Sequence, residues 1–201
     1  MFKIVKKILE MYTKDLTEFW WPVIPIIVII MAISCIIQYK KFSNSKNAFY
    51  KDKIDNKTIA YFEKQKTKWR FPSPENIRKY NTICFILCCV YLDLNDFTKF
   101  YEHINSIKLT YPEHNEQREE INVLLFTYFS GEKSISVINT YNEYKKVENE
   151  QQVIFKKMSN TFPFSEFDEK YAALKEVLNA NIQENHLCNF IELVKDISDD
   201  Q

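Results

Sequence analysis

Residues 20–37 read WWPVIPIIVIIMAISCII, a stretch of 18 residues without a charged side chain. At about 1.5 Å of rise per residue, a helix of this length covers most of a hydrocarbon core of about 30 Å. Aromatic and basic residues stand at both ends of the stretch, where they would anchor a span at the membrane surface. These anchor residues are Trp20, Trp21, Tyr39, Lys40 and Lys41. The sequence therefore predicts a transmembrane helix over residues 20–39, in contact with a lipid bilayer.

Three other interpretations of this stretch agree less well with its residues. A buried core helix is seldom apolar on all its faces over such a length. A cleaved signal peptide fits poorly, because the 19-residue leader contains three acidic residues and no clean small-x-small cleavage site follows. Residues 32–35 resemble a lipobox, but Ala32 stands where leucine is usual and the apolar run continues beyond Cys35. We therefore expect an uncleaved span, and lipidation of Cys35 stays open.

Composition limits the fold and the chemistry. The chain has 201 residues and one glycine, whereas an average composition of about 7% would supply roughly 14. Phosphate-binding loops and dinucleotide fingerprints need several glycines, so both are excluded. Tight hairpins of a β-sandwich are also disfavoured. The 27 basic and 27 acidic residues balance, so we expect no nucleic-acid partner. An all-α protein is predicted.

The rest of the chain divides by its polarity and its helix signals. Residues 1–19 form an amphipathic segment, and residues 40–72 form a polar juxtamembrane connector with a short helix. Two prolines near residue 72 break the chain. An all-helical domain is predicted over residues 73–201. Its central helix contains the apolar run ICFILCCVYL at residues 83–92, which is too short for a second span.

Helical hairpins follow that central helix. Their turns are predicted at Asn95, Gly131 and near Glu184. The segments VYLDLNDF (90–97) and YFSGE (128–132) resemble the hairpin turns of the tetratricopeptide repeat, a helix pair of about 34 residues. The resemblance implies an α-solenoid that binds a protein partner. Cys88 and Phe100 depart from the family's small residues and the third turn breaks the period, so a non-repeating helical bundle is the alternative.

The sequence offers little chemistry. His114 has no second histidine at helical spacing, as zinc hydrolysis would need. His186 and Cys188 are two residues apart and point to different faces of a helix. Cys84 and Cys88 share a face without histidine or acidic neighbours, which indicates core packing. We expect no catalytic residue, no metal site, no cofactor and no enzymatic activity.

The orientation in the membrane rests on charge. Lysines follow the predicted span at positions 40, 41, 46, 51 and 53, whereas the last ten residues before it hold only Lys14. This bias and the apolar surroundings of the cysteines favour a cytoplasmic C-terminal domain. Residues 2–19 argue for the opposite orientation, because they suit a helix lying on an anionic inner leaflet. A basic patch at residues 64–70 indicates anionic lipid contact or a solvated face.

Together these features predict a single-pass helical scaffold in a membrane, the plasma membrane if the protein is bacterial. Its repeat-like domain would bind a partner protein of unknown identity. The alternative is an oligomeric transport or pore-forming subunit. The span has no Gly-x-x-x-Gly motif and no polar stripe, which gives that alternative little support.

Overall fold

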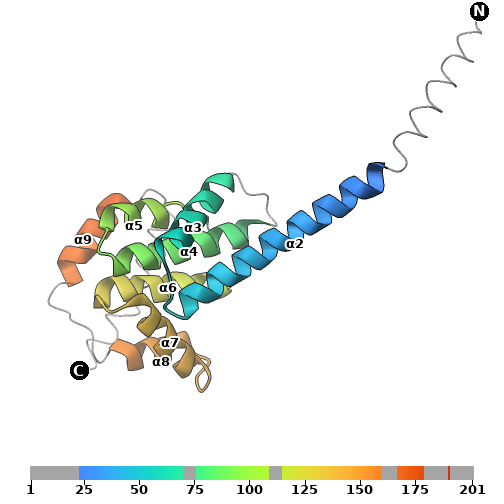
Figure 1. Ribbon diagram of the computed structural model, residues 1–201. Coiled ribbons are helices and arrows are strands. Elements are labelled where there is room, and N and C mark those ends of the chain that lie inside the picture. Colours follow the sequence, from blue (N-terminus) through green and yellow to red (C-terminus); the bar gives the residue numbers. More distant parts are fainter. Residues whose placement is uncertain (1–22, 70–75, 109–114, 160–166, 179–189, 191–201) are drawn as a thin grey trace, which may run out of the picture. The chain divides into compact units, whose positions relative to one another are not determined.

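A computed structural model describes residues 23–69, 76–108, 115–159, 167–178 and 190. All regular structure in these ranges is helical, which confirms the predicted all-α class (Figure 1). The helices are α2 (Val23–Tyr50), α3 (Asn56–Lys68), α4 (Ile77–Asp93), α5 (Phe97–Ile104), α6 (Asn115–Ser130), α7 (Ser134–Lys145), α8 (Gln151–Ser159) and α9 (Phe167–Val177). The chain divides into two compact units, Met1–Lys51 and Asp52–Gln201.

Helix α2 is 28 residues long and carries the apolar run. Its side chains from residue 24 to residue 37 are all exposed, with Ile36 at 65%. The helix is long and apolar enough to cross a membrane. It continues without a break to Tyr50, so the first part of the predicted connector is helical. No glycine or proline interrupts the helix after Pro25.

The second unit begins earlier than the predicted domain start at residue 73. Helix α3 contacts α4, and the side chain of Phe62 in α3 is fully buried. The Asp55 carboxylate caps α3, accepting hydrogen bonds from the Thr58 backbone N–H at 2.8 Å and hydroxyl at 2.6 Å. Residues 56–68 are thus the short helix predicted in the connector, and they pack within the second unit.

Helix α4 is the centre of this unit. Every side chain from residue 80 to residue 91 is buried, as the apolar run predicts. The helix contacts α3, α5, α6 and α7 (Figure 1). A helix that is apolar on all its faces can be stabilised only by neighbours on all sides, so α4 organises the positions of the others.

Two short turns join the helix pairs α4–α5 and α6–α7. Asn95 has a φ angle of 56° in the first turn, and Gly131 has one of 70° in the second. Both values lie in the left-handed region that glycine and asparagine adopt most readily. The predicted turn near Glu184 lies outside the described residues.

The two helix pairs differ in length. Helix α5 has 8 residues, whereas its counterpart α7 has 12. Helix α8 is separate from α7. The described residues therefore form helical hairpins without a visible repeated unit, and the tetratricopeptide resemblance gains no support from them.

Candidate functional site

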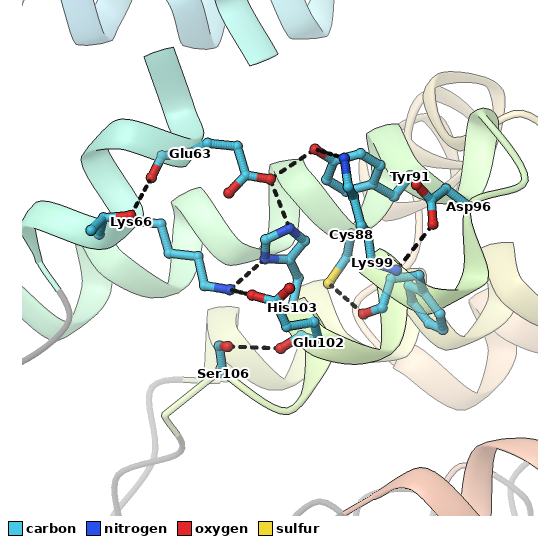
Figure 2. A network of polar contacts seen from close by, with 11 residues as sticks. Glu63, Lys66, Cys88, Tyr91, Asp96, Lys99, Glu102, His103 and Ser106 are labelled. Carbon is cyan, nitrogen blue, oxygen red and sulfur yellow. Dashed lines mark hydrogen bonds and ion pairs between the residues drawn. The ribbon is translucent and has the colours of Figure 1, made fainter. Parts of the chain in front are cut away.

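Titratable side chains from three helices meet inside the helical unit. We call this group the His103 cluster (Figure 2). Its members are Glu63 and Lys66 of α3, Tyr91 of α4, and Glu102 and His103 of α5. His103 is only 1% exposed, although it is polar and stands beside apolar residues of the core. Buried polar groups of this kind are stable only when each atom has a hydrogen-bond partner.

Both ring nitrogens of His103 contact α3. Nδ1 lies 2.6 Å from Nζ of Lys66, and Nε2 lies 3.1 Å from Oε1 of Glu63. A lysine ammonium can only donate, so Nδ1 must accept the hydrogen bond. The ring proton then resides on Nε2 and is donated to the carboxylate. These contacts therefore define a neutral imidazole in one tautomer.

Tyr91 completes the surroundings of the imidazole. Its ring stacks on that of His103, with centroids 5.2 Å apart and planes 12° apart. Its hydroxyl donates to Oε1 of Glu63 at 2.7 Å. Nζ of Lys99 lies 4.7 Å from the centroid of the same tyrosine ring. Burial, followed by the neighbouring carboxylate, raises the pKa of Tyr91, so the phenol stays protonated.

Lys66 links His103 to a second carboxylate. Its ammonium donates to Oε1 of Glu102 at 3.0 Å, and this hydrogen bond lowers the pKa of Glu102. The pKa of His103 is lowered, first because burial disfavours the imidazolium and then because the Lys66 charge opposes it. A neutral imidazole whose two nitrogens are occupied and shielded from solvent ties α5 to α3.

Two other buried polar side chains, those of Asn81 and Ser134, also connect elements. Asn81 donates from Nδ2 to the Lys108 carbonyl at 2.7 Å and accepts from the Lys108 N–H at 2.9 Å. Asp93 accepts from the backbone N–H of Ser134 at 2.7 Å, at the start of α7. The Ser134 hydroxyl in turn donates to the Cys89 carbonyl at 3.0 Å. These contacts fasten α4 to the end of the α5 segment and to α7.

The cysteines of α4 are buried thiols. Cys84, Cys88 and Cys89 have no exposed surface. Burial raises the pKa of Cys84 to about 12 and the pKa values of the other two well above their usual range. Thiolate chemistry at neutral pH is therefore suppressed. Within the described ranges, no three His, Cys, Asp or Glu residues are grouped so that they could hold a metal ion.

Several predicted residues can now be placed. Tyr39, Lys40 and Lys41 lie on α2 with exposed side chains, whereas Trp20 and Trp21 lie outside the described residues. His114, His186 and Cys188 also lie outside them.

The predicted basic patch on α3 needs correction. Its middle lysine, Lys66, has a side chain only 12% exposed and points toward Glu102 and His103 (Figure 2). Lys64 and Lys68 remain exposed. Lys66 follows Phe62 by four residues and so shares the buried face of α3. The three lysines therefore do not form one lipid-facing surface.

Sequence reasoning missed His103 altogether. Its partners Glu63 and Lys66 stand 40 and 37 residues earlier on another helix, so no local spacing connects them. One signal was present: His103 follows Phe100 by three residues and precedes Ile104, which places it on the apolar face of α5.

The chain matches no protein-family model, and neither a search of curated proteins nor one of solved structures found a match. The fold and the site therefore define only a class. It is an all-α chain in which one helix, long and apolar enough to cross a membrane, precedes a compact helical unit.

Proposed function

We propose that this chain is a single-pass membrane-anchored helical scaffold whose C-terminal unit binds a partner protein. The observation that carries the proposal is the contrast between the two units. Helix α2 leaves a continuous apolar surface exposed from residue 24 to residue 37. A soluble domain would bury such a surface, whereas a bilayer covers it.

A binding role is favoured over catalysis by the chemistry of the helical unit. Its buried polar side chains, such as His103 and Asn81, are occupied by contacts between helices. Its buried thiols are held protonated. Paired helices of this kind are common in proteins that present a surface to another protein. The proposal includes binding of the partner protein through a tetratricopeptide-like surface of the helical unit.

Lysines after the apolar run support contact with anionic lipid and a cytoplasmic helical unit. Lys40, Lys41 and Lys46 lie on the same continuous helix as the span. Basic residues next to a span are retained on the cytoplasmic side, and each is attracted to an anionic leaflet by about 1 kcal/mol.

The anchor is tested by alkaline carbonate extraction of membranes that contain the full chain. We expect wild-type protein in the membrane pellet. Replacing both Ile30 and Ile33 by arginine would raise the free energy of membrane insertion by about 2.5–3.5 kcal/mol per residue. We expect this variant in the supernatant. Leucine at the same two positions is the matched control and should leave it in the pellet. A wild-type chain that carbonate releases would refute the anchor.

Partner binding is tested by cross-linking in intact membranes, followed by purification of the full chain. A scaffold is expected to yield a stoichiometric complex with one other protein. A chain beginning at Asp52 should be soluble, helical by circular dichroism, and able to compete for that partner. If the full chain instead forms only homo-oligomers and conducts solute in proteoliposomes, it is a pore-forming subunit and the scaffold proposal fails.

A further inference from the structure

We propose that the His103 cluster is an acid-sensitive latch: protonation of the imidazole breaks its contact with Lys66 and releases α3 from α4 and α5. The inference goes beyond the proposed function and does not depend on the identity of any partner. It concerns the first helix that follows the apolar helix in the chain.

The geometry leaves no room for a second proton on the ring. Nδ1 of His103 lies 2.6 Å from the Lys66 ammonium, and a proton there would place two donors of like charge against each other. The side chain of His103 is 1% exposed, so solvent does not screen the repulsion. Protonation therefore requires one of the two cations to move.

The groups around the imidazole decide which cation moves. From α3, Glu63 favours the imidazolium and Lys66 opposes it. From α4, Tyr91 presents its ring face, and the buried thiols of Cys84 and Cys88, whose raised pKa values keep them uncharged, lie near Lys66. From α5, Glu102 also favours the charged form, and Nζ of Lys99 lies on the ring of Tyr91 (Figure 2). The charge conflict is thus confined to a single pair.

Lys66 is the partner free to leave. Glu102, which accepts its hydrogen bond, has a side chain 68% exposed, so the ammonium can reach water along that carboxylate. His103 is enclosed on α5 and cannot move in the same way. Because Lys66 belongs to α3, its departure removes one polar attachment of that helix, and α3 is then held by Glu63, which contacts His103 and Tyr91.

The direction of the pH effect follows from the two states. A released imidazole titrates near a pKa of about 6.5, whereas burial and Lys66 lower the pKa of His103 in the closed state. The pH-dependent stabilisation of the closed latch is therefore greatest above pH 6.5 and decreases as the pH falls below that value. The closed-to-open ratio falls by at most tenfold per pH unit, so that pH 5.0 lowers it by up to about 30-fold.

Hydrogen exchange of the full chain in lipid nanodiscs tests the latch at pH 7.5 and pH 5.0, after correction for intrinsic exchange rates. In wild-type protein we expect the protection of α3 peptides to fall by about 10- to 30-fold, while α6 and α7 change less than threefold. His103→Gln keeps an amide donor and acceptor but does not titrate. Its α3 protection should be equal at both pH values.

A second variant keeps the test decisive if His103→Gln does not fold. Lys66→Met removes the opposing cation, and Lys64→Met on the exposed face of the same helix is its matched control. Nuclear magnetic resonance should show the His103 titration below pH 6.5 in wild type and in Lys64→Met, and at higher pH in Lys66→Met. Equal α3 protection at both pH values in wild type, or identical titrations in the two lysine variants, would overturn the proposal.

Discussion

Replacing Asn81 by leucine should destabilise the helical unit, because it removes two hydrogen bonds with the backbone of Lys108. The Asn81 side chain is 2% exposed, and its amide makes two hydrogen bonds with the backbone of Lys108. Each such bond contributes about 1 kcal/mol net. Leucine has similar volume but leaves the Lys108 N–H and carbonyl without these partners. We expect a loss of about 2 kcal/mol in the free energy of unfolding.

Thermal unfolding of the full chain in detergent, followed by circular dichroism, measures this loss. For a unit of this size, about 2 kcal/mol corresponds to a fall in Tm of about 4–8 °C. Asn139→Leu is the matched control, because Asn139 is an exposed residue of α7; it should change stability by less than about 0.5 kcal/mol. If Asn81→Leu is as stable as this control, the contact with Lys108 does not fasten α4 to the segment after α5.

Two further predictions concern the turns and the thiols. Gly131→Val should lower the free energy of unfolding by about 1 kcal/mol or more, because its φ of 70° strains a side-chain-bearing residue. The strain arises from the backbone, because the nearest described atom to an added Cβ is Nζ of Lys170, at an ordinary contact distance of 3.8 Å. Asn95→Gly should not destabilise the other turn, and denaturant unfolding in which Gly131→Val is as stable as Asn95→Gly would contradict this reasoning. Burial raises the pKa of Cys84 to about 12, so at pH 8 it should react with a maleimide about 10³-fold more slowly in the folded protein than after denaturation. Mass spectrometry measures both rates, and equal rates would contradict the burial of this thiol.

Features that depend on local periodicity could be predicted from the sequence. The apolar run at residues 83–92 predicts the buried centre of the unit, because a helix without a polar face needs neighbours all round. Asn95 and Gly131 could be placed in turns because few residues adopt positive φ at low cost. The unbroken run at residues 20–37 likewise predicts a long apolar helix.

Features that depend on contacts between distant segments could not be predicted in the same way. The packing of α3 against α4 is one such feature, because it depends on Phe62 and on pairs of residues on different helices. Lys66 looked like part of a solvated face, since a lysine is rarely buried unless it is paired. Its partners Glu102 and His103 stand on α5, far along the chain.

The composition of α3 explains why the His103 cluster can control its position. Among the residues of α3, all of which the structure describes, only Phe62 is fully buried. Burial of one phenylalanine contributes about 1.5–3 kcal/mol, and the half-buried neighbours add less. A 30-fold change in the closed-to-open ratio of the latch corresponds to a free-energy change of about 2 kcal/mol. The polar and apolar contributions to the docking of α3 are therefore comparable. In α4, where many side chains are buried, the same polar contribution would be a small fraction of the apolar one. A titratable cluster at α3 can change one helix without unfolding the rest of the unit.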